Sequence, residues 1–380
     1  MHSKKNLKDI LSIGTSNLVY SIIYGLFWFY LASLLTKAEY GELGFLTSIA
    51  NVGSVIALLG LGLTVLVYEP KKENVFPASF VLVLIASTIA GVVSYVFIQN
   101  VIVSALIVGL AIFAIMLNGL TGNGRHRDYS IHNLIRAPST VALAIILYNF
   151  FGLNGILLGY FITSLFILKD LPSLLKGRKV RFSILRPKIG FMIYSWSNRV
   201  LQILFWWGDK LLIGSLFGFT VLASYQLAAQ YLLLLETFPR SLSQYLIPQE
   251  SEGKKNKKLK IFSPIAASLI AMISIVSIPY GIDTFLPAYH DSILPAQIMS
   301  ISIIPLSISM IQQSEFLGKE KSRIVFIGSI FQTGTYFLLI TWLGQAIGLM
   351  GIAIGFLASV SLRAIFNLIT GSHLREKNHS

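Results

Sequence analysis

The sequence predicts an all-α protein that crosses a membrane about twelve times. Of its 380 residues 54% are hydrophobic and 12% are charged, and the mean hydropathy is +0.73. The charged share is about half of that in soluble domains, and a soluble protein could not cover so much apolar surface. A membrane helix with its connection takes roughly 30 residues, so the length allows about twelve spans and no large domain outside the membrane.

Twelve long apolar runs carry this prediction. Each is continuous over 18 to 28 residues, whereas strands of a membrane barrel alternate over about 10 residues, so helices are favoured throughout. The first run is too long for the apolar part of a cleaved leader, and we expect it in the mature protein. The runs lie at 10–35, 43–68, 77–98, 101–121, 130–150, 153–170, 189–215, 219–246, 262–282, 293–316, 324–343 and 348–371.

Lysine and arginine residues predict the orientation of these spans. Alternate connections hold 25 of the 30 basic residues, the connections on the other side hold Lys37 alone, and four fall within spans. This asymmetry in short loops places the basic side, and both ends of the chain, in the cytoplasm. Contact with anionic lipids explains the basic run at 254–260, so no nucleic-acid partner is expected. The basic connections lie at 4–8, 71–72, 125–136, 169–188, 254–260, 319–323 and 375–377.

The longest basic connection predicts the boundary between two halves. Residues 169–188 carry seven basic residues and two prolines and divide the runs into six and six. We expect an N-terminal six-helix bundle at 1–170, a basic cytoplasmic linker at 171–188 and a C-terminal six-helix bundle at 189–380. Transporters that rock two bundles about a site at the membrane midplane have this organisation.

A stripe of polar side chains marks the seventh run. Arg199, Gln202 and Trp206 recur at steps of three or four, which places them on one face of a helix. Arg199 lies roughly 15 Å from the cytoplasmic start of the run, near the midplane. A cation at that depth must face protein or a watery cavity, where an anion would stabilise it. Asp209 and Lys210 lie about 30 Å in, at the outer rim, and suit a charge pair or a gate.

The first and eighth runs offer further polar faces. Gln226 and Gln230 lie on one face of the eighth run, and Asn17 and Tyr24 form a similar stripe in the first. Amides, hydroxyls and aromatic rings can bind sugars, and together with Arg199 these residues form the candidate substrate site. The same groups also hold membrane helices together by hydrogen bonds, which is the structural alternative for each of them.

Glu236 provides a structural alternative for Arg199. Its depth in the eighth run would allow its carboxylate to neutralise the guanidinium, which would then be a structural partner rather than a binding group. Glu236 is also spaced for an i,i+4 pair with Arg240. We group these two residues with Asp209 and Lys210 as charge pairs or gating groups.

Three more residues inside the C-terminal runs have local consequences. Pro239 and Pro305 predict kinks, because proline leaves a backbone carbonyl of the helix without its donor. Arg363 lies twelve residues before Arg375, and we expect its long side chain to reach the cytoplasmic interface as an anchor.

The sequence offers no site for catalysis, a metal or a cofactor. It has no cysteine, no glycine-rich phosphate loop and no metal-binding spacing of histidine and glutamate. A membrane glycosyltransferase or polymerase needs acids gathered at one site, whereas Glu39, Glu42, Asp283 and Asp291 are spread over different outer connections. We therefore expect a protein that is not an enzyme.

Two stretches of the chain resemble a known family. One is the sequence DKLLIG at 209–214 followed by ASYQLA at 223–228, and the other is FYLA at 29–32 followed by LTKAEYG at 35–41. They are similar to polysaccharide-biosynthesis membrane proteins, the oligosaccharide flippases of the multidrug/oligosaccharidyl-lipid/polysaccharide exporter superfamily. The resemblance implies the V-shaped exporter fold of two six-helix bundles, which open alternately to each side and move a glycan on a polyprenyl lipid.

The residues and the resemblance lead to one hypothesis and two alternatives. We expect a flippase that moves lipid-linked oligosaccharide from the cytoplasmic to the outer leaflet of the cell membrane by alternating access. Its partners would be a polyprenyl-(di)phosphate-linked glycan, membrane lipids and glycosyltransferases of the same pathway. The first alternative is a cation-coupled exporter of multidrug type, which needs acidic residues inside a bundle, and the N-terminal half has none well inside its spans. The second is a membrane glycosyltransferase or polymerase.

Reporter fusions test the expected topology. A fusion after Tyr289 is expected to report the outside and a fusion after Lys257 the cytoplasm, because the basic connections stay on the cytoplasmic side. The reverse result at either position would mean that a span has been miscounted, and the division into two six-helix halves would be wrong.

Overall fold

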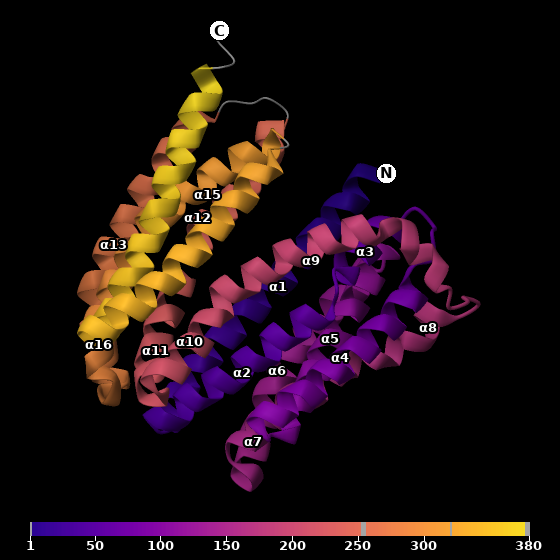
Figure 1. Cartoon of the computed structure of the whole chain (residues 1–380), viewed down its shortest axis with the longest axis horizontal. Helices are drawn as coiled ribbons and strands as arrows, with labels where there is room; N and C mark the ends of the chain where they lie inside the picture. The colour runs from indigo at the N-terminus through magenta and orange to yellow at the C-terminus, as the bar shows by residue number, and fades with distance from the viewer. Residues whose placement is uncertain (1, 252–255, 320, 377–380) are drawn as a thin grey trace. The chain divides into compact units, whose positions relative to one another are not determined.

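The computed structural model describes residues 2–251, 256–319 and 321–376 of the chain (Figure 1). Over these residues the protein consists of helices and their connections, without a strand, so the expected all-α class is confirmed. Lys254, Lys255 and Lys377, which contribute to the expected cytoplasmic charge, lie outside the described residues.

The chain forms two compact units. Unit 1 contains the chain up to Trp28 and Phe45–Gly208, and unit 2 contains Phe29–Gly44 and the chain from Asp209 onwards. These boundaries differ from the expected bundles at 1–170 and 189–380. The seventh expected span, at 189–215, is divided between the two units after Gly208. Phe29–Gly44, which includes the expected first outer turn, belongs to unit 2.

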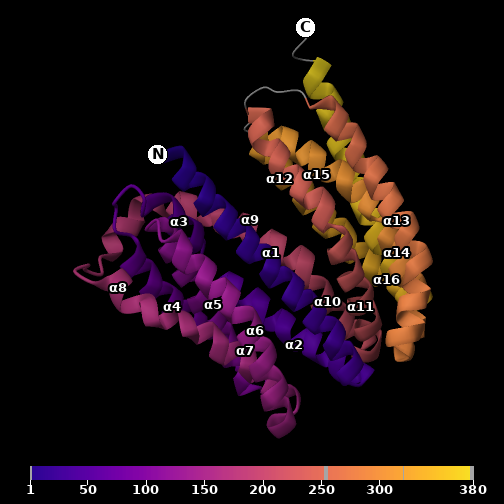
Figure 2. The same ribbon diagram turned by 180° about the vertical axis from the view of Figure 1, so that it is seen from behind.

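Unit 1 is a bundle of packed helices. Helices α4, α5, α6 and α7 lie side by side (Figure 2). The chain then continues through α9 into one π-helical turn at Leu204–Gly208. The helices are α1 (His2–Leu34), α2 (Lys37–Ala57), α3 (Leu61–Tyr68), α4 (Phe76–Ile98), α5 (Val101–Gly122), α6 (His126–Phe151), α7 (Leu153–Leu165), α8 (Leu171–Leu175) and α9 (Ile189–Ile203), of which α1 and α2 extend into unit 2.

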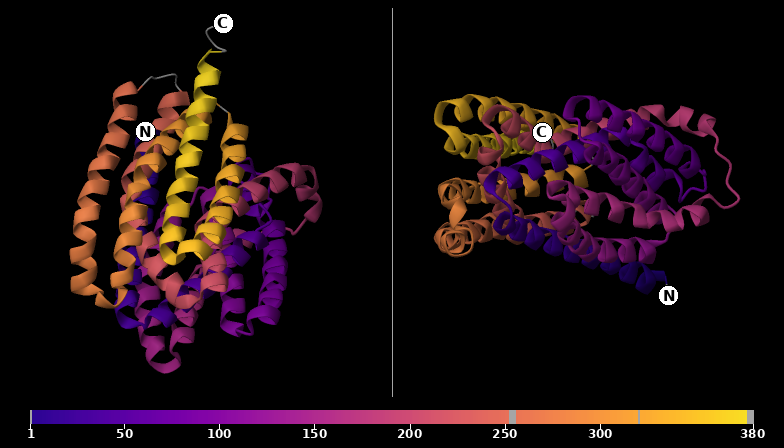
Figure 3. Two further views of the ribbon diagram at one scale, coloured as in Figure 1. Left: turned by 60° about the vertical axis from the view of Figure 1, so that its left-hand side comes forward. Right: turned by 90° about the horizontal axis from the view of Figure 1, so that it is seen from below.

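Unit 2 is a second bundle of packed helices. The orange and yellow helices α13 to α16 run side by side (Figure 3). Helix α11 packs against α14, and α12 packs against α15. The helices are α10 (Asp209–Phe217), α11 (Phe219–Leu235), α12 (Thr237–Ser251), α13 (Lys257–Phe285), α14 (Ile293–Ile301), α15 (Ile303–Gly318) and α16 (Ser322–Glu376).

The twelve expected runs all fall on helices, although the helical elements do not correspond to the runs one to one. Among the described residues nine helical segments are long and apolar enough to cross a membrane, and α2 with α3, bent by 52°, makes a tenth. Two expected runs lie in the single element α16, whose backbone is non-helical at Ile347 and Gly348. The eighth expected run is divided into α11, of 17 residues, and α12, of 15 residues.

The bend between α2 and α3 positions α9. Gly60 has a φ of 73°, and a Cβ at this position would lie 2.1 Å from the carbonyl oxygen of Met192 in α9. The Ser195 hydroxyl donates to the Gly60 carbonyl at 3.2 Å, and Trp196 Nε1 donates to the Ile56 carbonyl at 2.9 Å. The carbonyls at the helix break therefore hold the seventh expected span in place, and only glycine allows so close an approach.

The expected linker is part of unit 1 because it carries apolar side chains as well as basic ones. Leu174 and Leu185 of this segment, together with Ile167 just before it, are buried in one core cluster with residues of α3, α4 and α5, such as Phe76 and Leu120. The basic residues between them give the segment the composition of a cytoplasmic loop. Burial of these three side chains explains why the segment folds onto unit 1.

A buried carboxylate ties this segment to the bundle. Glu69 Oε1 accepts a hydrogen bond from the Phe76 amide at 2.6 Å, and its Oε2 accepts from Arg178 Nη1 at 2.9 Å. Arg178 Nη2 also donates to Asn123 Oδ1 at 2.5 Å. The Glu69 side chain is 2% exposed. It therefore joins the start of α4, the end of α5 and the basic segment at one point.

We expect Glu69→Ala to lower the free energy of unfolding by about 3 kcal/mol or more, because it leaves the buried Phe76 amide and Arg178 Nη1 without their acceptor. Thermal unfolding of the purified protein in detergent measures the change. Arg181→Ala is the control, because it removes an exposed cation of the same segment and is expected to change stability by about 0.5 kcal/mol or less. Equal losses in both variants would contradict the role of the buried carboxylate.

The expectation that Arg363 anchors the protein at the interface is wrong. The residue is 1% exposed, and its Nη2 donates to the Val325 carbonyl at 2.9 Å. A Cβ on Gly328, which lies earlier in α16, would be 2.0 Å from Arg363 Nη1. The absence of a side chain on this glycine therefore leaves room for the guanidinium. The aliphatic stem is long enough to reach a backbone acceptor inside the protein instead of water.

Candidate functional site

The polar stripe of the seventh expected span lies on α9 and the π-helical turn of unit 1. Arg199 and Gln202 are exposed, and Arg199 Nη1 donates to Gln202 Oε1 at 3.2 Å. Trp206 is half-buried in the π-helical turn that follows. Single π-helical turns inside α-helices occur frequently at functional sites. The arrangement leaves most of the guanidinium donors of Arg199 available to a ligand.

Arg199 and Glu236 each have a recorded partner inside their own unit. Among the described ion pairs, none within 4.0 Å involves Arg199. The Glu236 carboxylate accepts from Arg240 Nη2 at 2.9 Å, which is the expected i,i+4 pair. The carboxylate that the structural alternative assigns to Arg199 is thus engaged with Arg240 of its own unit.

The polar stripe of α1 is engaged with neighbouring helices. Asn17 Oδ1 accepts from Asn133 Nδ2 at 2.8 Å and from the Tyr129 hydroxyl at 3.1 Å, both on α6. The Tyr24 ring stacks on Tyr20 with centroids 4.4 Å apart, and it meets Tyr160 edge-on at 5.6 Å. Asn17 and Tyr24 therefore hold helices together in this structure.

Arg136 is a buried cation, whereas the sequence predicts it in a cytoplasmic connection. It lies inside α6 and is 7% exposed. Its guanidinium stands over the Phe113 ring at 3.9 Å from the centroid, and its Nε has no hydrogen-bond partner among the described residues. The sequence signal was available, because Arg136 follows the start of the apolar run at 130 by six residues. Unit 1 thus carries a buried arginine inside α6 in addition to Arg199 on α9.

In unit 2 the Asp209 carboxylate lies at the centre of a buried polar cluster. Asp209 is 4% exposed and lies 3.4 Å from the Lys210 ammonium. The Tyr225 hydroxyl donates to Asp209, and the Tyr336 hydroxyl lies 3.3 Å from the same carboxylate. The two tyrosine hydroxyls are 2.5 Å apart. The sequence identified the charged pair, but not the tyrosines that close it off from solvent.

The two glutamines of α11 differ in exposure. Gln226 is 1% exposed, and a Cβ on Gly44 would lie 1.7 Å from its Oε1, so the amide fills the space that this glycine leaves. Gln230 is half-buried. Of the two, Gln230 is placed to meet a ligand without a rearrangement of helices.

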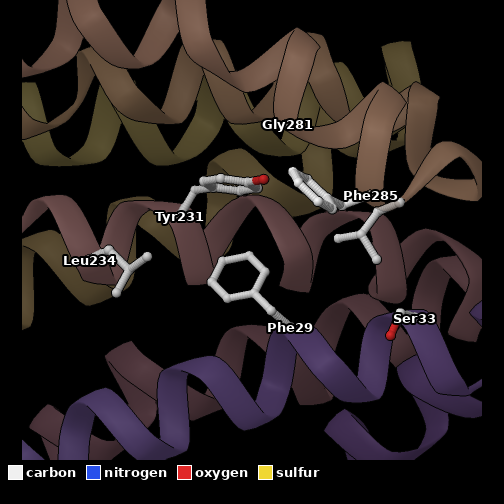
Figure 4. Close-up of a pocket in the computed structure, with 7 residues that line it drawn as sticks. Phe29, Ser33, Tyr231, Leu234, Gly281 and Phe285 are labelled. Carbon is white, nitrogen blue, oxygen red and sulfur yellow. The ribbon is translucent and has the colours of Figure 1, made fainter.

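A small apolar pocket of unit 2 lies between α1, α11 and α13 (Figure 4). Its volume is about 370 Å³. The Phe29 and Tyr231 rings meet edge-on with centroids 5.0 Å apart. None of the residues predicted for substrate binding lines this pocket. The lining consists of Phe29, Ser33, Tyr231, Leu234, Gly281, Phe285 and Leu286.

Three acids of the outer connections are each engaged by a neighbouring side chain. Glu39 Oε2 accepts from the Thr36 hydroxyl at 2.7 Å at the start of α2. Asp291 pairs with Lys37 at 2.6 Å, and Asp283 lies 2.7 Å from His290 Nδ1. Among the described residues no group of three or more His, Cys, Asp or Glu could hold a metal ion.

Comparison with known proteins relates this arrangement to a family. Residues 129–290 match the family model of polysaccharide biosynthesis proteins. The match includes the stretch of 209–228 that carries the resemblance seen in the sequence, and that resemblance is confirmed. No curated protein matches the chain.

Solved structures share the fold over nearly the whole chain. The lipid II flippase MurJ, in an inward closed conformation, has a TM-score of 0.78 at 14% identity over 95% of this chain and 87% of its own. An inward-facing multidrug resistance MATE family transporter of the MOP superfamily has a TM-score of 0.65 at 15% identity over 93% and 94%. A MATE transporter of Vibrio cholerae has a TM-score of 0.65 at 15% identity over 99% of both chains. The protein is therefore a multi-pass membrane protein with the fold of flippases and exporters.

We expect Glu42→Ala and Asp283→Ala, made separately, to leave the length and amount of cell-surface glycan unchanged, because we expect a protein that carries out no acid–base chemistry on the glycan. Gel profiles of the extracted glycan measure both quantities. Shortened chains with normal export in either variant would point to a polymerase and contradict the expectation.

Proposed function

We propose that this protein is a flippase that moves a lipid-linked oligosaccharide from the cytoplasmic to the outer leaflet of the cell membrane. The match to polysaccharide biosynthesis proteins at 129–290 is the observation that carries the proposal. A fold shared with a lipid II flippase supports the same class of cargo. Fold alone does not define function, so the argument for the cargo must come from the side chains.

Arg199 is the residue that best fits the phosphate group of such a cargo. Its guanidinium is exposed, lies on a spanning helix and has Gln202 as its recorded partner. A guanidinium binds a phosphate through two parallel hydrogen bonds, which an ammonium cannot do. Gln202 offers an amide and Trp206 an aromatic face to the sugars beside that phosphate.

The lipid part of the cargo needs no polar path. A polyprenyl tail is as apolar as the bilayer and can remain there while the head group crosses by alternating access. The apolar pocket with Phe29, Tyr231 and Phe285 can take up part of a lipid chain. In a cell that is negative inside, outward movement of each negative charge gains about 2.3 kcal/mol per 100 mV, so the membrane potential favours export.

A cation-coupled exporter of small molecules is the second candidate. The fold shared with MATE transporters supports it, and so does the buried Asp209 carboxylate with its two tyrosines. Vesicles that contain the purified protein distinguish the two candidates. Movement of a fluorescent polyprenyl-diphosphate glycan favours the flippase, whereas efflux of cationic dyes without glycan movement favours the small-molecule exporter.

We place the flippase in the cell membrane with both chain ends in the cytoplasm, following the distribution of basic residues. On that side it would receive its cargo from the glycosyltransferases of the same pathway.

We expect Arg199→Ala to abolish glycan export while the protein still inserts and accumulates. Loss of a charged hydrogen-bonding partner costs about 2–5 kcal/mol, or roughly 30-fold or more in affinity for the head group. Arg199→Lys is expected to recover only part of the export, because lysine lacks the bidentate geometry. Export per membrane-inserted protein is the measurement, and Arg323→Ala, which removes an exposed arginine of a cytoplasmic connection, is the control.

A double variant separates this role from a structural one. If Arg199 served only to neutralise Glu236, Arg199→Gln combined with Glu236→Gln would remove both charges and restore export. Normal export by that double variant would refute binding of the head group by Arg199.

A further inference from the structure

The connection between α8 and α9 in unit 1 is too short to leave the membrane surface (Figure 1). The helical segments Leu153–Leu175 and Phe182–Phe217 are both long and apolar enough to span a membrane, and residues 176–181 join them. A chain of this length reaches about 20 Å when fully extended, and it must leave the membrane and return within that reach. Its side chains therefore lie near the lipid head groups.

Two inward-facing cations and one apolar side chain fix this region against unit 1. Arg178 Nη1 donates to the buried Glu69 carboxylate at 2.9 Å. Lys188 is buried and pairs with Glu73 at 2.5 Å. The Leu185 side chain lies in the core of unit 1. The backbone is thus held at three points, which leaves the residues after Arg178 to face outward.

Four consecutive outward-facing residues alternate between cations and apolar groups. Lys179 and Arg181 are exposed, Val180 is 47% exposed and Phe182 is 50% exposed. The ion pairs of the described residues include neither of these cations. We call residues 179–182 the interfacial strip. Apolar side chains beside cations are typical of segments that lie in a membrane interface.

The acids nearest to the strip in sequence and in space are already engaged. Residues 171–191 contain no aspartate or glutamate. Asp170, just before them, pairs with Arg125 at 2.5 Å and lies 2.6 Å from His132 Nε2. The two glutamates that anchor the segment are occupied by their own cations. The positive charge of the strip is therefore left for an anion outside the protein.

Neighbouring cations add to this charge. Lys176 and Arg186, on either side of the strip, are exposed. Lys71, in the connection between α3 and α4, lies close to the anchored Lys188, because both ammonium groups stand over the Tyr68 ring. Their distances from the ring centroid are 4.8 Å and 4.5 Å. Cations of two connections thus come together beside the strip.

We propose that the interfacial strip binds anionic phospholipids of the leaflet that it faces. Lys179 and Arg181 bind the head-group phosphates, and Val180 and Phe182 enter the acyl layer beneath them. An acidic protein partner would explain the two cations but not the two apolar side chains at the level of the head groups. The proposal does not depend on the proposed function, because lipid binding requires no transport.

Lipid binding at the strip would also hold the end of α9 at the membrane surface. The 3₁₀ segment Phe182–Lys188 connects the strip directly to Ile189, the first residue of α9. Since Leu185 and Lys188 fix this connecting segment on unit 1, a head group bound at the strip is attached to the bundle as a whole. Anionic lipid is therefore expected to stabilise the folded protein.

Thermal unfolding of the purified full chain in a neutral detergent tests which lipid binds. We expect added phosphatidylglycerol to raise the unfolding midpoint by about 2–4 °C over the same concentration of phosphatidylcholine, because a ligand that binds the folded state stabilises it. Soluble glycerol phosphate is expected to give no shift, because it has no acyl chains. An equal shift with both lipids, or a shift that glycerol phosphate reproduces, would overturn the proposal.

A charge variant locates the binding. Lys179→Gln combined with Arg181→Gln is expected to raise the phosphatidylglycerol concentration needed for half of the shift roughly 30-fold, which corresponds to about 1 kcal/mol for each cation. Arg127→Gln combined with Arg323→Gln is the control, because it removes the same charge from exposed positions in two other basic connections. Equal losses in both variants would mean that only the net charge matters, and the strip would not be the site.

An apolar variant separates a membrane surface from an acidic partner. Val180→Ser combined with Phe182→Ser keeps both cations and is expected to raise the same half-shift concentration about tenfold or more, because less apolar area enters the acyl layer. Unchanged lipid binding in this variant, with binding lost in the charge variant, would indicate a polyanion or an acidic protein and contradict the proposal.

A fluorescent label measures insertion without any comparison of stabilities. The chain contains no cysteine, so Val180→Cys provides a single position for an environment-sensitive dye. In nanodiscs that contain phosphatidylglycerol, we expect brominated acyl chains to quench this dye strongly and aqueous iodide to quench it weakly. The same dye at Arg127→Cys is expected to show the reverse order. Equal quenching by iodide at both positions would refute insertion of the strip.

Discussion

The rest of the structure depends on one constraint, that lipid offers no hydrogen bonds to polar groups. Backbone groups must therefore form their hydrogen bonds within helices. Wherever a helix is interrupted, the freed groups need other hydrogen-bond partners nearby. At the break after α2 the Gly60 and Ile56 carbonyls accept additional hydrogen bonds from Ser195 and Trp196 of α9. Charged side chains obey this rule only in part, since Arg363 Nη2 donates to the Val325 carbonyl while its Nε and Nη1 have no partner among the described residues. A buried polar group that lacks a hydrogen-bond partner is then a candidate for binding a ligand.

Hydropathy predicts the helices well because the backbone groups of each apolar run must form their hydrogen bonds within that run. It says little about which helices pack together. The long element α16 was expected as two spans, and only its backbone at Gly348 shows where they meet. The expected linker was identified by its charge, yet Leu174 and Leu185 fold it onto unit 1. Two buried leucines among the basic residues of 171–188 do not stand out in a composition window, although they decide where the segment lies.

The sequence finds polar residues within spans but cannot tell a binding group from one that holds helices together. Asn17 and Gln226 looked alike on their helical faces, and the structure places Asn17 against α6 and Gln226 against a glycine. The difference depends on partners distant in sequence, such as Asn133, which no local pattern reveals. Arg199 differs because its recorded partner, Gln202, is one turn away on the same helix. A local pattern can therefore reveal both Arg199 and its partner, and the other guanidinium donors of Arg199 are left for a ligand.

The charge of Arg199 determines what the membrane potential contributes. Arg199 lies on α9 of unit 1 and favours an anion. Outward movement of one negative charge gains about 2.3 kcal/mol per 100 mV in a cell that is negative inside. Because Arg199 belongs to unit 1, binding of the head group there would have to act on unit 2 through a conformational change.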